Sequence, residues 1–364
     1  MSKPTGVLKL PDQQFDIHLA EREDADLICQ MLIEAAEWMI SQGIYQWTPE
    51  QFTKEEILSY FEYREIYIVY AQTQPAAMFT LQQSDPDYWG MRNSRGYNYL
   101  HRLTVRRAYS SGGLGARIVE WASNRTRENG GKGLRLDCLA QNLKLNSFYQ
   151  RLGFRYMGTA LKNGREYNLY EQWEFRAPVR DPDLVDFVYF NDRDFHLLQR
   201  WSASEAFQLQ WAGGNWSYPL TEEDMRTYME GANLPWKSDK LIFKVIHRDS
   251  GESIGHISLS QIDRRNRSAR ISRVILGDPD YRGRGIGKAM IVEMLRIGFQ
   301  ALNLHRITLG VFDFNKPAIQ LYLSAGFRKE GLMREKTLYR NEYWSMLEMS
   351  MLRREWEELY QEEP

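Results

Sequence analysis

Short segments in the C-terminal half of the chain alternate between hydrophobic and polar positions. This period of two predicts β-strands over 241–246, 252–260 and 268–276. The turn-forming run Asp249–Gly251 separates the first two strands, which predicts a hairpin. A buried strand is also predicted over 306–312, and two closing strands are predicted over 331–344 and 345–352.

A different period marks residues 285–302. Apolar side chains recur there about every 3.6 residues, which predicts a helix with one buried face. That face consists of Ile286, Met290, Ile291, Met294, Leu295 and Phe299. A short helix is predicted over 317–324, with Pro317 in its first turn and Gly326 after its end. In the N-terminal half, helices are predicted near 24–41 and 53–61.

The order of these elements is early helices, an antiparallel meander, and then alternating strands and helices. This order predicts an α/β (α+β) fold in which a mixed, mostly antiparallel central sheet is flanked by helices.

The chain repeats itself. A glycine-rich segment followed by a helical pattern occurs at Tyr109–Gly115 and again 172 residues later at Tyr281–Gly287. A second block, with Asn, Tyr and Gly at matching places, starts at Asn142 and recurs 173 residues later at Asn315. A repeat of this length predicts two whole domains. We place them at 1–176 and 185–364, joined by a linker at 177–184 that contains two prolines and two aspartates.

Composition and charge narrow the class of protein. A chain of 364 residues is long enough for two domains, and 43% hydrophobic with 26% charged residues is ordinary for a globular protein. The formal net charge of -1 gives no field that favours nucleic acid. The two cysteines and six histidines form no CxxC or HExxH motif, so no metal is expected. Without an apolar leader or a bilayer-spanning stretch, we expect a cytoplasmic protein with no membrane partner.

A strand, a glycine-rich turn and a helix in succession form a place to hold phosphate. Glycines let successive N–H groups approach one anion, and the helix start adds partial positive charge. Arg282, Arg284 and Lys288 add full charges at the C-terminal loop. The loop is not a Walker A motif, because Ala289 follows Lys288, and its glycines do not have the spacing of a dinucleotide fingerprint.

The pattern Arg282-x-x-Gly285-x-Gly287 resembles the acyl-CoA pyrophosphate loop of the GNAT superfamily of N-acetyltransferases. The block from Asn315 to Phe327 resembles the next motif of that superfamily. The resemblance implies acetyl-CoA as cosubstrate, an amine as acceptor, and two GNAT-like domains in tandem. The implied cofactor-binding loop residues are Arg282, Gly283, Arg284, Gly285, Ile286, Gly287 and Lys288 in the C-terminal copy, and Gly112, Gly113, Leu114 and Gly115 in the N-terminal copy. The N-terminal loop is degenerate, because Ser110 stands at the place of Arg282 and only Arg117 remains as a nearby charge.

The resemblance also implies roles for residues outside the loop. The backbone of the strand before the loop holds the pantetheine arm, near Ile275 and Leu276 in one copy and near Leu103 and Val105 in the other. Tyr322 and Tyr149 match the tyrosine that protonates the leaving thiolate, and the alternative for each is a core aromatic. Asn315 and Asn142 match an asparagine that contacts the cofactor, and the alternative is a helix cap. The C-terminal copy is similar to the branch that acetylates protein N-termini and polyamines.

An amine attacks only after losing its proton, so a base or a water chain is needed. His101, on the strand before the N-terminal loop, is a candidate base, and the alternative is a histidine hydrogen-bonded inside the sheet. In the C-terminal copy Asp263 is a weaker candidate that fits a solvated turn. Neither cysteine falls in a motif, so the expected mechanism is direct attack in a ternary complex.

The acceptor is open at this level: a small molecule, a polyamine, an antibiotic or a protein N-terminus. The early segments carry aromatic side chains that either form a pocket for a cation or pack at a domain interface. They are Trp38 and Trp47, with Gln46, in the first copy and Trp201, Trp211, Trp216 and Trp236 in the second. The alternative function is an acyl-CoA-binding regulatory or scaffold protein with one or both copies inactive. The tandem predicts a pseudo-dimer within one chain, which is a monomer or a homodimer.

Overall fold

The computed structural model describes residues 4–172, 184–214 and 216–360. The described residues divide into two compact units, one made of those in 4–142 and 160–172 and one made of those in 143–159 and 184–360. The predicted linker at 177–184 lies outside the described residues, apart from Leu184, and so do residues 173–176. Among the described residues, each helix is too short or too polar to span a bilayer.

The N-terminal repeat is built on an eight-stranded sheet with the order β1-β2-β3-β4-β5-β6-β8-β7. The strands are β1 (Gly6–Leu10), β2 (Gln13–Leu19), β3 (Glu65–Ala71), β4 (Gln74–Gln82), β5 (Tyr97–Val105), β6 (Gly133–Leu139), β7 (Arg155–Lys162) and β8 (Arg165–Gln172). Neighbours from β1 to β5 pair antiparallel, as do β6 and β8, whereas β5 and β6 pair parallel. The mixed, mostly antiparallel sheet predicted from the sequence is confirmed.

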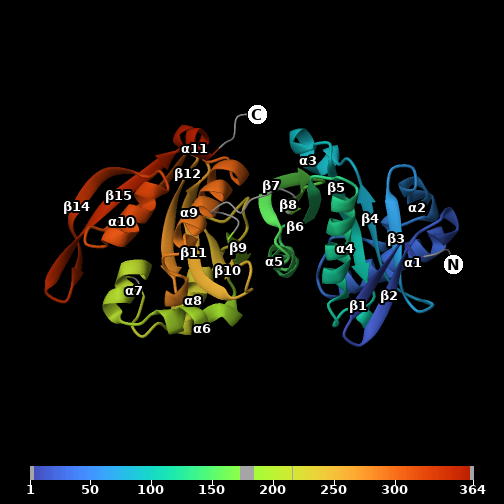
Figure 1. Ribbon diagram of the computed structural model, residues 1–364, viewed down its shortest axis with the longest axis horizontal. Coiled ribbons are helices and arrows are strands. Elements are labelled where there is room, and N and C mark those ends of the chain that lie inside the picture. The colour runs from blue at the N-terminus through green and yellow to red at the C-terminus, as the bar shows by residue number, and fades with distance from the viewer. Residues whose placement is uncertain (1–3, 173–183, 215, 361–364) are drawn as a thin grey trace. The chain divides into compact units, whose positions relative to one another are not determined.

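The helices of this repeat are α1 (Ala25–Ser41), α2 (Lys54–Tyr60), α3 (Pro86–Trp89), α4 (Leu114–Glu128) and α5 (Leu143–Arg151). The helices predicted near 24–41 and 53–61 are therefore confirmed as α1 and α2. The Thr53 hydroxyl starts α2 by accepting a hydrogen bond from the Glu56 N–H at 3.2 Å. In Figure 1, α1 and α2 lie on one side of the sheet and α4 lies on the other.

The C-terminal repeat is built on a seven-stranded sheet with the order β14-β15-β13-β12-β11-β10-β9. The strands are β9 (Val185–Tyr189), β10 (Leu241–His247), β11 (Ser253–Asp263), β12 (Ser268–Leu276), β13 (Arg306–Phe312), β14 (Arg328–Tyr339) and β15 (Glu342–Leu352). The strands predicted at 268–276 and 306–312 are confirmed to the residue. β12 and β13 form the parallel pair of this sheet, as β5 and β6 do in the first repeat.

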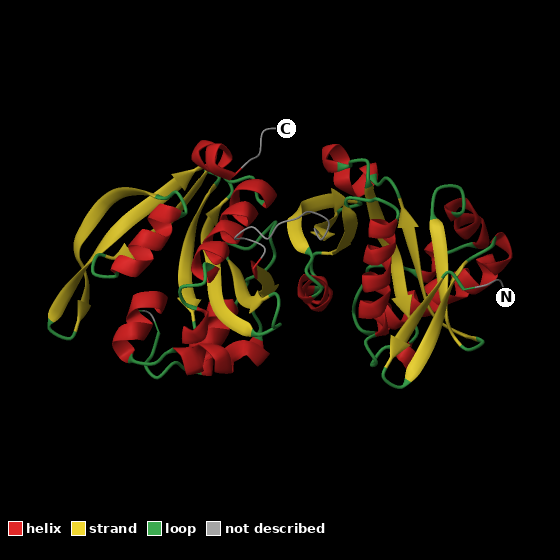
Figure 2. Cartoon of the chain, viewed as in Figure 1, coloured by secondary structure: helices red, strands yellow, loops and turns green. Residues whose placement is uncertain are grey.

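The closing hairpin differs from the prediction. The turn lies at residues 340–341, between β14 and β15, and not at the predicted division between 344 and 345. Arg340 adopts a left-handed conformation with φ 54°, as two-residue hairpin turns require. The predicted strand ran through this turn because the turn contains neither a glycine nor a proline. Figure 2 shows the hairpin extending beyond the rest of its sheet.

The helices of this repeat are α6 (Phe195–Trp201), α7 (Glu205–Ala212), α8 (Glu222–Met229), α9 (Ile286–Arg296), α10 (Lys316–Ser324) and α11 (Arg353–Tyr360). The helix predicted over 285–302 is α-helical to Arg296 and then widens into a π-helical turn at Ile297–Ala301. Its predicted apolar face is buried. Within the second unit, α5 packs on β9, where the Gln150 side chain accepts a hydrogen bond from the Tyr189 N–H at 3.0 Å.

Candidate functional site

The centre of the C-terminal sheet opens between β12 and β13. These parallel strands pair at three positions, from Ser268 with Arg306 to Arg270 with Thr308. Beyond Arg270, β12 continues to Leu276 without a partner in β13 within the described residues, while its other edge stays paired with β11. One edge of β12 is therefore available to a ligand that needs backbone hydrogen bonds.

The glycine loop lies directly after this open edge. Tyr281 anchors it, because its hydroxyl donates to a Glu252 carboxylate oxygen at 2.5 Å. Gly283 and Gly285 both adopt positive φ, and Gly285, with φ 80° and ψ -10°, is the N-cap of α9. No side chain caps this helix within the described structure. The first backbone N–H groups of α9 are therefore available to donate hydrogen bonds to an anion bound at the loop.

The predicted cations of the loop fit the same purpose. Arg282 and Arg284 are exposed beside the uncapped start of α9, and Lys288 lies within its first turn. Gly287 packs closely on α10, because a Cβ there would lie 3.2 Å from a Leu321 methyl group. The loop thus presents backbone donors and positive charge together, as a pyrophosphate requires.

Two predicted residues lie on or before α10. The side-chain oxygen of Asn315 accepts a hydrogen bond from the Ala318 N–H at 3.3 Å, so Asn315 is the N-cap of this helix. The capping alternative is thus correct for Asn315, and a cofactor contact stays a prediction. Tyr322 is buried, and burial raises its pKa to about 12. Its phenol is protonated at neutral pH, as a proton donor must be.

The N-terminal repeat opens in the same way. β5 and β6 pair from Tyr97 with Gly133 to Leu100 with Leu136, and they have no pair beyond this point within the described residues. Gly113, with φ 81° and ψ 11°, is the N-cap of α4 and matches Gly285. The charge differs, because Arg117 forms an ion pair with Glu120 at 2.7 Å.

The remaining residues predicted for the first copy are distributed between the two compact units. Leu103, Val105, Gly112, Gly113, Leu114, Gly115 and Asn142 belong to the first unit. Tyr149, on α5, is buried and belongs to the second unit. Its predicted role as a proton donor for the first copy stays a prediction.

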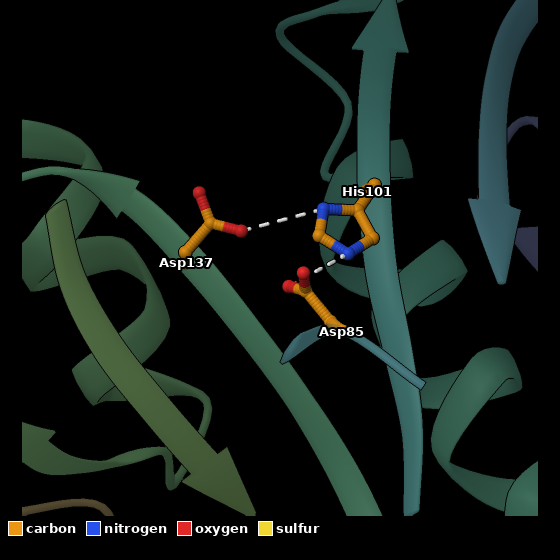
Figure 3. Close-up of side chains that lie close together, drawn as sticks. All are labelled: Asp85, His101 and Asp137. Atoms are coloured by element: carbon orange, nitrogen blue, oxygen red, sulfur yellow. Dashed lines mark ion pairs between the residues drawn. The ribbon is translucent and has the colours of Figure 1, made fainter. Parts of the chain in front are cut away.

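Three side chains meet where β5 and β6 separate; we call Asp85, His101 and Asp137 the histidine cluster (Figure 3). His101 follows the last paired residue of β5, and Asp137 follows the last paired residue of β6. Asp85 is the N-cap of α3. The His101 Nε2 atom lies 3.3 Å from an Asp85 oxygen, and its Nδ1 atom lies 3.3 Å from an Asp137 oxygen. These are ion-pair distances, and neither contact has hydrogen-bond geometry.

The surroundings of the histidine cluster favour a charged imidazole. The three side chains are 12%, 4% and 9% exposed for His101, Asp85 and Asp137. Burial by itself would lower the pKa of His101, but the two carboxylates outweigh it and raise that pKa above its ordinary value. His101 is thus a histidine held between acids, and its role as a base stays a prediction. The ligand atoms of the cluster lie within 4.8 Å of one another, close enough for a divalent cation.

Both open strands carry a bulge that the sequence did not reveal. Arg102 and Arg273 have positive φ, at 55° and 51°, next to register shifts against β4 and β11. Ile275 pairs with His256, and the residue that pairs at the matching place in the first copy is Thr104. Thr104, which lies between the predicted Leu103 and Val105, therefore takes the position of Ile275. The reason is that the connection from strand to loop is one residue shorter in the first copy.

Several of the other sequence candidates lie at a turn or in a hydrophobic core. Asp263 ends β11, and its carboxylate accepts hydrogen bonds from the backbone and side-chain nitrogens of Asn266, in the following turn, at 2.8 and 2.7 Å. Trp201 and Trp211 are buried in the core formed by α6, α7 and α8, and Trp216 packs against it. Trp47 packs against the corresponding core of the first repeat. Asp85, Asp137, Arg102 and Arg273 were missed, and the signal that could have found the arginines is their occurrence in both copies.

Comparison with known proteins agrees with this geometry. The model of the Acetyltransferase (GNAT) domain matches residues 176–328, and that of the Acetyltransferase (GNAT) family matches residues 32–154. The N-acetyltransferase YesJ of Bacillus subtilis is 31% identical over 156 residues, which are 41% of this chain and 85% of that protein. The chain belongs to the GNAT family of N-acetyltransferases. Its enzyme class is therefore acyl-CoA-dependent transfer of an acetyl group to an amine, and both GNAT matches support the tandem read from the repeat.

Other similar proteins act on named amines. The spermidine N(1)-acetyltransferase of Vibrio cholerae is 33% identical over 99 residues, which are 27% of this chain and 56% of that protein. The L-amino acid N-acetyltransferase AaaT of Escherichia coli is 33% identical over 93 residues, or 26% and 57% of the two chains. A solved structure of the Vibrio cholerae spermidine N-acetyltransferase with CoA and spermine is 22% identical. It covers 48% of this chain and 98% of that chain, with a TM-score of 0.42.

Proposed function

We propose that the C-terminal repeat of this GNAT protein binds acetyl-CoA and transfers its acetyl group to a primary amine by direct attack in a ternary complex. The observation that supports this best is the open edge of β12 leading into a loop with two arginines and an uncapped helix start. The loop would take the pyrophosphate, and the open edge near Ile275 and Leu276 would take the pantetheine arm through backbone hydrogen bonds.

The chemical step needs a donor for the leaving thiolate. Tyr322 is our candidate, because its buried phenol stays protonated well above neutral pH. His256 is an unsuitable base in this repeat, since burial lowers its pKa to about 3 and leaves the imidazole too weak to accept a proton at pH 7. The named relatives acetylate spermidine and L-amino acids, which supports an amine as the acceptor.

We propose that the N-terminal repeat is the weaker cofactor site and acts chiefly as a support or regulatory domain. Its glycine loop has the same cap geometry but has serine and glycine in place of the two exposed arginines, and Arg117, in the first turn of α4, is paired with Glu120. A second turnover site in this repeat would need acetyl-CoA to bind without those charges.

The test compares one variant in each loop by acetyl-CoA-dependent release of free thiol. In the C-terminal loop, Arg282→Ala/Arg284→Ala should lower kcat/KM for acetyl-CoA at least about 100-fold, because two charge-assisted phosphate contacts are lost. In the N-terminal loop, Gly113→Asp places a carboxylate at the matching cap, where φ 81° also strains any side chain. Turnover should nevertheless stay within about twofold, because the proposed reaction takes place in the C-terminal repeat. If turnover were lost in the Gly113 variant and kept in the arginine variant, catalysis would belong to the N-terminal repeat and the proposal would be contradicted.

A further inference from the structure

An arginine lies in an aromatic box beside the open strand of the C-terminal repeat. The guanidinium of Arg273 stands 4.3 Å from the centre of the Tyr228 ring and 4.6 Å from that of Trp216. The residue is half-buried, and the described residues provide no carboxylate within ion-pair distance of its guanidinium. Its Nε atom is buried and its side chain interacts with Tyr228, but the absence of a carboxylate partner leaves the other guanidinium donors for a ligand.

Neighbouring side chains hold the two aromatic rings of the box in place. Tyr228 is buried, and its hydroxyl lies 3.3 Å from the Nε2 atom of the fully buried His256. The Trp216 ring packs edge-on against both Trp211 and Tyr228, with centroids 5.6 and 5.1 Å away. The aromatic faces are therefore fixed around the guanidinium, so that little conformational entropy is left to lose when a ligand binds it.

The same arrangement occurs in the N-terminal repeat. Arg102, in the matching bulge, lies 5.2 Å from the ring centres of Trp47 and Phe52, and it donates to the Tyr60 hydroxyl at 3.1 Å. Tyr60 and Tyr228 each stand seven residues after the threonine that caps their helix. The glycine loops have diverged in charge while the arginine and its aromatic partners are present in both copies. This contrast argues for a use beyond packing.

Two charged side chains that lie near the arginine of the first repeat have uncharged counterparts in the second. In the first repeat, Arg102, Asp85 and Asp137 all act on the neighbouring Tyr88. By strand register, the residues of the second repeat that replace His101 and Asp137 are Ser272 and Gly310, which are uncharged. The positive charge of Arg273 is thus not balanced by these positions, and a ligand can supply the missing negative charge.

We infer that Arg273 receives a carboxylate of the acceptor, so that the amine acetylated by the C-terminal repeat is an amino acid or another small amino carboxylate. The inference rests on the proposed function of this repeat. The aromatic faces that could have held a cationic substrate already hold the guanidinium, and a polyamine would place a second cation beside it. The guanidinium fork matches the two oxygens of a carboxylate, and one such charge balances one guanidinium.

The place of Arg273 fits this use. It lies two residues before Ile275, on the strand whose open edge is proposed to hold the thioester arm. Its partners Trp216 and Tyr228 come from the segment that contains α7 and α8, and α7 packs on β12. Arg273 would therefore bind and orient the acceptor without taking part in bond making.

The experiment measures thiol release from acetyl-CoA with the twenty L-amino acids, their carboxamides, spermidine and O-phosphoethanolamine as acceptors. We expect kcat/KM for the best amino acid to exceed that of its amide at least about tenfold, as one charge-assisted contact allows. Arg273→Gln should bring this ratio to within about threefold of one, through KM and not kcat, if the contact acts in binding alone. Arg273→Lys, which keeps the charge but not the fork, should give an intermediate ratio.

Calorimetry with acetyl-CoA on the same proteins separates two kinds of failure. Unchanged acetyl-CoA affinity of Arg273→Gln shows that the variant is folded and that the acceptor site alone has changed. If the full chain binds no acetyl-CoA, the proposed function itself fails. If acetyl-CoA binds but spermidine, the phosphate or the amides are preferred, or no amino acid is acetylated, or the ratio survives Arg273→Gln, then the assignment of a carboxylate to Arg273 is overturned.

Discussion

The histidine cluster of the first repeat makes the strongest quantitative prediction, through the substitution Asp137→Asn. This change keeps the shape of the side chain while it removes one of the two carboxylates that lie 3.3 Å from the imidazole. At an effective dielectric constant of about 20, a unit charge pair at that distance attracts by roughly 5 kcal/mol before desolvation is subtracted. A net loss of about 1.5–3 kcal/mol is typical when a hydrogen bond or contact to a charged group is removed. We therefore expect Asp137→Asn to lower the free energy of unfolding of the first repeat by about that amount.

The sign of the pH dependence follows from the raised pKa of His101. The folded-state pKa of His101 lies above the ordinary value of about 6.5, which applies to the unfolded chain. The imidazolium therefore contributes its full stabilisation of the fold at pH values below about 6.5. The contribution is lost as the pH rises through the folded-state pKa. The destabilisation by Asp137→Asn should therefore be largest near pH 6 and should shrink at alkaline pH, where the imidazole is neutral and the two carboxylates repel each other.

Two measurements check this reasoning. In a histidine-detected NMR titration, His101 should titrate above its ordinary value in the full chain and lower in Asp137→Asn. Hydrogen exchange of the β5 and β6 amides at pH 6 should be roughly 10- to 100-fold faster in the variant. This ratio corresponds to the expected loss of about 1.5–3 kcal/mol in the free energy of unfolding. Asp263→Asn, in a turn of the other repeat, is the charge-matched control and should change neither. A His101 pKa at or below its ordinary value, or one that Asp137→Asn leaves in place, would refute the electrostatic account.

Three further outcomes are expected. Tyr322→Phe should lower kcat about 100-fold or more while the acetyl-CoA dissociation constant stays the same, since a general acid contributes that much; equal kcat would exclude the proton-donor role. Gly310→Ala should lower the unfolding free energy of the second unit by about 1–3 kcal/mol, because a Cβ there would lie 2.3 Å from an Arg270 nitrogen that Glu348 holds in place. Gly331→Ala, where a Cβ meets nothing within 4 Å, is its control, and equal unfolding midpoints would contradict the packing argument. Dialysis against EDTA should leave turnover and the thermal midpoint unchanged, because the carboxylates of the histidine cluster already face an imidazolium; restoration by added divalent cation would show a metal requirement.

Much of the fold could be predicted because the informative signals are local. The glycine loops, the helix starts at Gly113 and Gly285, and the strands at 268–276 and 306–312 each depend on residues within a short window. The internal repeat then supplied the second copy. The end of β14 at Tyr339 was missed because the two-residue turn that begins at Arg340 contains neither a glycine nor a proline.

The parts of the sites that could not be predicted depend on tertiary contacts. Asp85 and Asp137 reach His101 from a helix cap and from a neighbouring strand, far apart in sequence. The bulges at Arg102 and Arg273 shift the strand register by one residue, which no periodicity shows. The connection after β5 is one residue shorter than the one after β12, so the sequence alone did not single out Thr104 as the counterpart of Ile275.

The central claim is that the C-terminal repeat holds the working acetyl-CoA site, and calorimetric titration of acetyl-CoA into the full chain tests it most directly. The account predicts one tight site per chain, abolished by Arg282→Ala/Arg284→Ala and retained in Gly113→Asp. Two equivalent sites, each removed by one of the variants, would contradict the assignment of the first repeat as the weaker one. Absence of any acetyl-CoA binding would contradict the claim as a whole.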